Sequence, residues 1–306
     1  MSSAAAAIKL SHALKSIIAA PHALGSPRAS PGRSSTSLLF NKIRSEGEAG
    51  GVGRETWLTL TGAAMVTVNS PEGICELFDY AKPDGIQDQV RTAAVLRETA
   101  LKCVSFIGIA KVINNLTALR AHLPEPVKQG LSIESIRHPK PDNLSITSRR
   151  GRALWDAIYE PHSTKLLSKL ADAHPDLPTH ILQSHYGPLL SDPFSTDPPG
   201  AFKVGRLLTS VVAIACLRGQ QGVGPQVTSH VFGLKKALVE GGGAQGEDEL
   251  QGQQWLTSDE GVGWLIRSTD EKLLRDRNFV KMILGTGKIA VGELNMGSDG
   301  GWIRWR

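Results

Sequence analysis

The chain has 306 residues, of which 41% are hydrophobic and 21% charged. This composition can build one large core or two smaller ones and excludes a fibrous or wholly disordered protein. The formal net charge of +5 arises before the first acidic residue, Glu46, and the remainder is close to neutral, which argues against a nucleic-acid-binding surface. The basic residues that precede Glu46 are Lys9, Lys15, Arg28, Arg33, Lys42 and Arg44.

Residues 1–40 form a basic leader rich in Ser and Pro. Apolar residues within positions 7–18 fall on one stripe of a helix, with Lys9 and Lys15 away from it. A basic, acid-free amphipathic start is typical of a mitochondrial transit peptide. The alternative is a disordered basic tail on a cytoplasmic or nuclear protein. The stripe consists of Ala7, Leu10, Leu14, Ile17 and Ile18.

Residues 41–125 form an N-terminal helical block. Helices are predicted around residues 37–48, from Glu55, and over 71–81, where Pro71 follows the N-cap residue Ser70. The longest apolar stripe runs from residue 93 to 110, and Gly108 is expected to bend or divide that helix before 112–123. The uncharged run at residues 56–71 is too short and polar for a membrane span.

Residues 126–150 are predicted to be a linker, because prolines and basic pairs interrupt them without a clear hydrophobic period.

Residues 151–284 form a second helical region. Its first helical pattern stops at 174–176, and Pro178 opens another through residue 186. The uncharged segment 207–217 predicts a helix buried on all sides, and Pro225 begins a helix that reaches about residue 238. An exposed spacer at 245–254 and a helix over 258–284 precede a Gly-rich tail, 285–306. Strand patterns are nearly absent, so an all-α fold is expected.

The cysteines and histidines predict no metal site. Cys75, Cys103 and Cys216 are far apart in sequence and lie in apolar helical patterns, so each is expected to be a buried, reduced thiol. Four histidines fall close together, but their spacings place no two on one face of an α-helix. They are His162, His174, His180 and His185.

An ordered series of short motifs resembles the AhpD-like family, which includes alkylhydroperoxidases and carboxymuconolactone decarboxylases. The resemblance implies an all-α, AhpD-like helical bundle that assembles as a trimer or hexamer. Its motifs are residues 150–159, Pro161-His162, residues 173–177, Tyr186-Gly187, residues 205–208, residues 217–220 and the histidine helix from Gln226 to Gly233, together with Glu98 and residues 106–109 and 114–116.

The redox motif of the peroxidase members is missing. Those members place a glutamate and a Cys-x-x-Cys before the histidine, and a peroxidatic cycle needs both thiols. A CxxC-dependent peroxidase is therefore not expected. The corresponding places hold Val211, Val223 and Gln226 when counted back from His230, and Ala110, Ile113 and Thr117 when counted forward from Glu98.

The decarboxylase-like members imply a different site, in which His and carboxylate groups transfer protons without a cofactor. His230 and Glu98 are the candidate catalytic residues, and Gln226, Gly233 and Arg206 are the candidate ligand-binding residues. Arg206 begins Arg-Leu-Leu where many members have Arg-Glu-Leu, so one carboxylate is absent. The structural alternatives are a hydrogen-bonded core role for His230 and an ion pair of Glu98 with Arg97, Lys102 or a distant arginine.

Three functions follow. The first is a ligand-binding or noncatalytic helical protein without redox cysteines. The second is a cofactor-free decarboxylase or isomerase of lactones or keto acids that uses His230 and Glu98. The third is a structural subunit or scaffold, in which the linker and the tail tryptophans, Trp302 and Trp305, contact partners.

Overall fold

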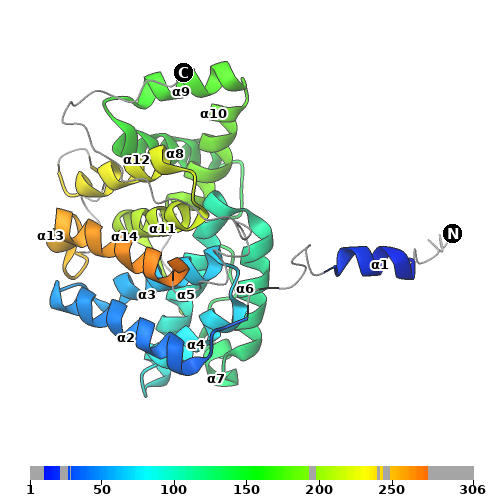
Figure 1. Cartoon of the computed structure of the whole chain (residues 1–306). Helices are drawn as coiled ribbons and strands as arrows, with labels where there is room; N and C mark the ends of the chain where they lie inside the picture. Colours follow the sequence, from blue (N-terminus) through cyan, green and yellow to red (C-terminus); the bar gives the residue numbers. More distant parts are fainter. Residues whose placement is uncertain are drawn as a thin grey trace, which may run out of the picture.

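The regular structure consists of helices. The computed structural model describes residues 10–20, 27, 29–192, 198–239, 242–243 and 249–274, and within these ranges every regular element is helical (Figure 1). The all-α prediction is therefore confirmed. The Gly-rich tail, with Trp302 and Trp305, and the end of the helix predicted over 258–284 lie outside the described residues.

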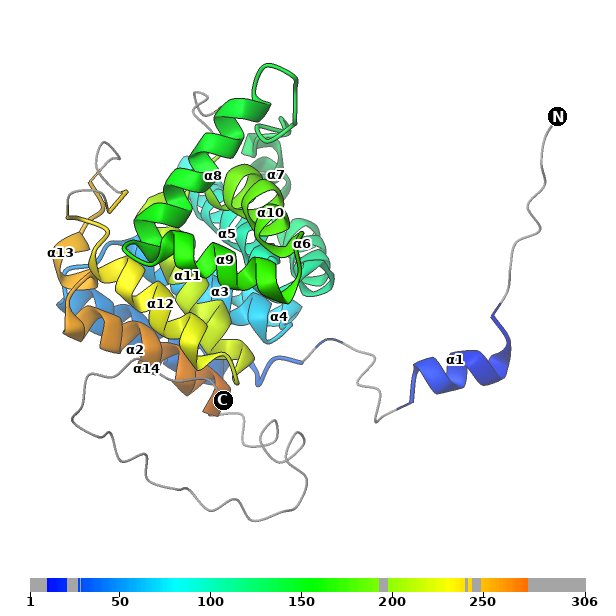
Figure 2. The same cartoon turned by 90° about the horizontal axis from the view of Figure 1, so that it is seen from above.

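Helix α1 (His12–Ile18) lies apart from the body of the molecule (Figures 1 and 2). The side chain of Ser11 accepts a hydrogen bond from the backbone N–H of Leu14 at 3.2 Å and so caps the first turn. None of its residues is buried, and its apolar residues Leu14, Ile17 and Ile18 are exposed. Helix α1 therefore presents its apolar face without a partner among the described residues.

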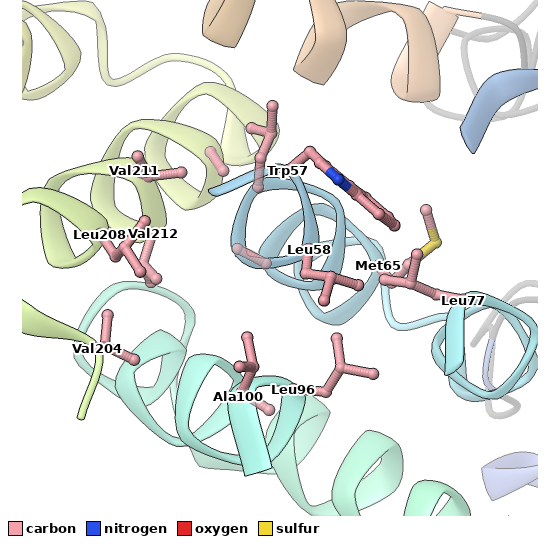
Figure 3. Close-up of a cluster of buried hydrophobic side chains, with 14 of the residues drawn as sticks. Trp57, Leu58, Met65, Leu77, Leu96, Ala100, Val204, Leu208, Val211 and Val212 are labelled. Carbon is pink, nitrogen blue, oxygen red and sulfur yellow. The ribbon is translucent and has the colours of Figure 1, made fainter. Parts of the chain in front are cut away.

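Helices α3 and α11 form the centre of the main core. In α3 (Arg54–Thr67) every residue from Thr56 onward is buried, and α11 (Gly205–Gln220) is buried from Arg206 to Leu217, which confirms the predicted buried helix. Figure 3 shows α3 between α11 and α5 (Ile86–Ile107). The hydroxyls of Thr61 and Thr67 donate to carbonyls four residues earlier, each at 2.7 Å, which satisfies these polar groups inside the core.

The first helical block matches the sequence pattern closely. Helix α2 spans Arg33–Ala49 and α4 spans Pro71–Ala81, the latter with the predicted bounds. Gly108 has a φ of 79° and separates α5 from α6 (Ile109–His122). A left-handed φ is easily adopted only by glycine, so the predicted division occurs at this residue.

The predicted linker is partly helical. Helix α7 (Glu125–Gly130) carries a proline in its first turn, where the missing N–H costs nothing. Helix α8 (Leu144–Tyr159) also begins inside the linker. Its first turn exposes Leu144 and Ile146, so the sequence there has no apolar stripe from which a helix could be predicted.

Helix α8 crosses a π-helix, η2 (Ile181–Leu190), at very close range. A Cβ atom on Gly151 would lie 2.5 Å from the backbone nitrogen of Gly187, so both helices need glycine there. Helix η2 follows α9 (Ser163–Ala173) and α10 (Leu177–His180). The single helix predicted from Pro178 is therefore two elements, and the second is wound in the rarer π form.

Helices α8 and η2 contribute the buried residues of a second, smaller hydrophobic cluster. This cluster is built on Trp155, Ile158, Tyr186 and Leu190, and Phe106 of α5 packs against it and against the main core. In Figure 1, α8, α9 and α10 lie at the top of the molecule. The boundary between the two clusters is therefore marked by Phe106.

Helix α12 (Gly224–Lys235) lies against both α11 and α8. It begins one residue before Pro225 and ends three residues earlier than the pattern predicts, in a turn at Lys236. Helices α13 (Gln253–Leu256) and α14 (Asp259–Leu274) follow, so the end of the predicted spacer is helical. Among the described residues, no helix combines the length and apolar character needed to cross a membrane.

Candidate functional site

His230 lies in a buried aromatic cluster that four elements build, α5, α8, η2 and α12. It is 4% exposed, and its Nε2 lies 3.3 Å from the hydroxyl of Tyr159 on α8. That hydroxyl lies 3.0 Å from the hydroxyl of Tyr186 on η2. We call His230, Tyr159, Tyr186, Trp155 and Phe106 the aromatic cluster.

The rings of the aromatic cluster enclose the imidazole. Phe106 meets His230 edge to face, with centroids 5.6 Å apart, and Trp155 packs on Tyr159 with centroids 4.1 Å apart. Tilted and edge-to-face pairs of this kind are favourable. The Gly151–Gly187 contact brings α8 close to η2, and this places Tyr159 beside Tyr186.

The polar groups of the aromatic cluster are neutral at pH 7. Burial, with a smaller contribution from the positive charge of Arg206, lowers the pKa of His230 to about 3. Burial raises the pKa of Tyr159 and of Tyr186. Nδ1 of His230 is buried and has no hydrogen-bond partner among the described residues. The neutral groups of the cluster can hydrogen-bond to one another, but protonation of His230 is costly.

Arg206 and Gly233 lie close to His230. The Arg206 side chain is buried and donates from Nε to the carbonyl of Gly242 at 3.2 Å and from Nη2 to the carbonyl of Gly233 at 2.8 Å. Nη1 donates to Ser210. A Cβ atom on Gly233 would lie 3.0 Å from Ile158. Arg206 thus joins α11 to α12, and Gly233 allows α12 to approach α8.

Gln226 is exposed in the first turn of α12. The sequence analysis placed it on the interior face because it is four residues before His230. The structure corrects that placement: the first turn of α12 extends beyond the packed region, since Gly224 has no neighbour within 4 Å of an added Cβ.

Glu98 belongs to a network of charged groups that connects α5 with Arg137 and Asp192. Arg137 donates to both Glu98 oxygens, from Nη1 at 3.2 Å and from Nη2. Nη2 also lies 3.5 Å from Asp192. Asp192 pairs with the fully buried Lys102 at 2.8 Å and accepts from the backbone N–H of Gly205 at 2.6 Å. The partner of Glu98 is therefore a distant arginine, one of the three structural alternatives.

Glu98 also lines a cavity of about 280 Å³. Its walls come from α5, α6, residues 132–137 and residues 200–202, and we call it the Glu98 cavity. Its charged lining residues are Arg97, Glu98, Glu134 and Arg137, and its largest apolar ones are Leu101, Leu116, Ile136 and Phe202.

The structure does not place His230 in the Glu98 cavity. His230 is absent from the residues that line it. Phe106, the α5 residue in contact with His230, lies eight residues beyond Glu98, or about 12 Å along the helix axis. The two candidate catalytic groups therefore occupy different environments.

The cysteines are not arranged as predicted in every respect. Cys103 and Cys216 are buried, but Cys75 is only partly buried, because it faces a second cavity between α4 and α6. Burial and a hydrogen bond with Cys216 raise the pKa of the Cys103 thiol. These two cysteines, distant in sequence, meet where α5 packs on α11, and the pairing could not be predicted from their spacing.

Two of the four histidines share a face. The rings of His180 and His185 lie 5.2 Å apart, and Nδ1 of His185 lies 3.1 Å from the hydroxyl of Ser105. The α-helical spacing rule fails here because a π-helix aligns residues five apart. The described residues contain no group of three or more side chains suited to hold a metal ion.

Sequence reasoning missed most of the charged network. Lys102 was expected only as a partner of Glu98, Arg137 was assigned to a linker, and Asp192 was not a candidate. Lys102 lies off the apolar stripe, next to Cys103, so no pattern in the sequence indicates that it is buried and needs a partner.

Comparison with known proteins gives one relative. The chain is 30% identical over 214 residues to "Peroxisomal protein 2" of Saccharomyces cerevisiae (strain ATCC 204508 / S288c), and the alignment covers 61% of this chain and 68% of the relative. No family model matches the chain. No solved structure matches it either.

Proposed function

We propose, from the premise that the chain belongs to the family of yeast Peroxisomal protein 2, that it is an AhpD-like helical protein without redox cysteines that binds a small organic ligand. The Glu98 cavity is the proposed binding site. Its volume is near the lower end of the range of ligand pockets, roughly 300–1,000 Å³. Apolar walls with a few converging charged groups are typical of such sites.

The observation that carries this proposal is the contrast between the two candidate residues. Glu98 lines a cavity, whereas rings enclose His230 and its pKa is lowered to about 3. A general base acts best with a pKa near the working pH. The arrangement favours ligand binding over acid–base catalysis.

Ligand-observed NMR against a library of small acids, amides and alcohols tests the proposal. We expect hits whose signals are lost in Ala201→Trp, because the indole would occupy the Glu98 cavity. The matched control is Ala121→Trp, which places the same side chain in the second cavity and should keep the hits. A library with no hit, or hits insensitive to Ala201→Trp, would contradict the proposal.

A cofactor-free decarboxylase or isomerase is the second candidate. The hydrogen-bonded series Tyr186, Tyr159 and His230 supports it, because such a series can relay a proton to a substrate. Turnover of lactones and β-keto acids should then fall by ~10²–10⁴ in His230→Gln, the usual contribution of a general acid or base. The same loss is expected in Glu98→Gln. Unchanged rates in both variants would end this candidate.

The exposed leader helix supports import into mitochondria, which we propose as the location. Its apolar stripe is free to meet an import receptor. The name of the yeast relative supports peroxisomes as the alternative. A fluorescent protein fused to the C-terminus should follow a mitochondrial marker, and Leu14→Asp with Ile17→Asp should abolish this. A wild-type fusion that follows a peroxisomal marker would refute the mitochondrial location.

A further inference from the structure

Two of the four charged residues that line the Glu98 cavity, Glu98 and Arg137, neutralise each other. Glu98 accepts two hydrogen bonds from Arg137, and Asp192 is paired with Lys102. These four groups carry no net charge together. Glu134, which also lines the cavity, is exposed to solvent.

Arg97, unlike the exposed Glu134, is partly buried, and it has no ion pair with the described residues. Its Nη1 donates to the carbonyl of Ser132 at 3.2 Å, and this is its one hydrogen bond to the described residues. No described carboxylate lies within 4 Å of its guanidinium, which has five N–H donors. Burial, and then the positive charge of Arg120, lower the pKa of Arg97, and the negative charge of Glu98 opposes them only in part.

The rest of the cavity suits a small apolar group. Phe202 forms part of the wall and is held by Arg91, whose guanidinium lies 5.1 Å from the ring centroid. Leu101 and Leu116 face the same space. A volume of about 280 Å³ is ample for a single ring, since an apolar cavity of ~150 Å³ holds benzene.

We infer that the Glu98 cavity takes a small monocarboxylate, with its carboxylate paired to Arg97 and its hydrocarbon part against Leu101, Leu116 and Phe202. This inference rests on the proposed ligand-binding function and adds the chemical class of the ligand. Arginine suits the role because its planar fork matches a carboxylate. Arg97 is then the residue that determines specificity.

Titration calorimetry of the full chain with benzoate and benzamide tests the inference. The two probes have nearly the same shape and differ in charge. Benzoate should bind at least ~10-fold more tightly, which corresponds to about 1.4 kcal/mol. Its affinity should fall with added salt more than that of benzamide. Equal affinities would overturn the inference, even if Arg97 variants did not fold.

Arg97→Met should weaken benzoate at least ~10-fold and leave benzamide unchanged, because it removes the charge and keeps the length of the side chain. Arg152→Met is the control, since it removes the same charge from an exposed ion pair on α8. Undiminished benzoate binding in Arg97→Met would overturn the inference. The library of small acids, amides and alcohols gives a second test. If its hits are neutral compounds that no longer bind Ala201→Trp, the monocarboxylate inference is overturned and the ligand-binding proposal stands.

Discussion

At the scale of single residues, His230 couples the aromatic cluster to the stability of the fold. Its imidazole is almost fully buried, and its pKa is lowered to about 3. In the unfolded chain a histidine has a pKa of about 6.5. Between these two values the unfolded state binds a proton that the folded state does not, so stability falls as the pH is lowered through this window.

We therefore expect acidification from pH 7 to pH 5 to cost about 2 kcal/mol of unfolding free energy through His230 alone. Urea unfolding at the two pH values measures it. Because other groups also titrate, the informative quantity is the difference between the wild type and His230→Gln, which should lose this part of the pH dependence. Equal pH dependence in the two proteins would show that His230 is not held neutral.

The cysteines make a second prediction at this scale. Burial and nearby carboxylates raise the pKa of Cys75 to about 11, so its thiolate at pH 8 should be at least ~100-fold scarcer than that of an ordinary cysteine. Cys103 and Cys216 are buried. We expect slow alkylation of Cys75 by iodoacetamide and labelling of the other two only after unfolding. Rapid labelling of Cys103 in the native protein would contradict this.

The candidate residues show what sequence can predict at this scale. His230 and Gly233 could be placed together from helical spacing on α12, whereas Arg206, on α11, was a candidate only through the family resemblance. The partner of Glu98 could not be predicted, because Arg137 reaches it from a segment without regular structure. Pairing across the fold depends on tertiary geometry, which one sequence does not encode in any local pattern.

At the scale of elements, the contact between α8 and η2 depends on two glycines. Replacing a helical glycine by alanine ordinarily stabilises a protein by about 0.5–1 kcal/mol. At Gly151 the added methyl group would meet the backbone of Gly187 at 2.5 Å. Overpacking of this kind typically costs ~1–3 kcal/mol.

Gly151→Ala should therefore lower the free energy of unfolding and disturb the environment of Trp155, one turn further along α8. Chemical unfolding followed by tryptophan fluorescence measures both effects. Gly224→Ala is the matched control, because an added Cβ there meets nothing within 4 Å. A Gly151→Ala protein as stable as this control would show that the helices can separate at little cost.

Helix bounds were predictable where a local signal exists. Pro71 after Ser70 marked the start of α4, and the left-handed conformation of Gly108 separates α5 from α6 as expected. The start of α8 and the π form of η2 carry no such signal. The first turn of α8 exposes its apolar residues. The π form of η2 depends on its packing against α8.

At the scale of the whole molecule, helix α1 is separate from the body, whereas residues 33–40 of the predicted leader belong to α2, with Leu39 and Phe40 in the main core. No residue of α1 is buried, so its contacts contribute nothing to the core. Deletion of residues 1–20 should change the midpoint of thermal unfolding by less than about 1 °C, because α1 buries no residue. A loss of ~1 kcal/mol in the free energy of unfolding would already lower the midpoint by a few degrees. Differential scanning calorimetry checks this. A drop of several degrees would mean that helix α1 packs on the body.

Assembly is the other property of the whole molecule. The family resemblance implies a trimer or hexamer, and we propose a homo-oligomer on that ground. Light scattering coupled to gel filtration gives the mass directly, and a monomer at micromolar concentration would contradict the proposal.

The winding of η2 makes the aromatic cluster sensitive to chain length. A segment with hydrogen bonds five residues apart contains, in effect, one more residue than an α-helix between the same ends. Removing one residue before Tyr186 while the π winding persists would turn that side chain around the helix axis by the angle of one residue. Tyr186 would then point away from Tyr159, although every residue of the aromatic cluster would still be present. The cluster thus depends on the number of residues in this segment as much as on their identity.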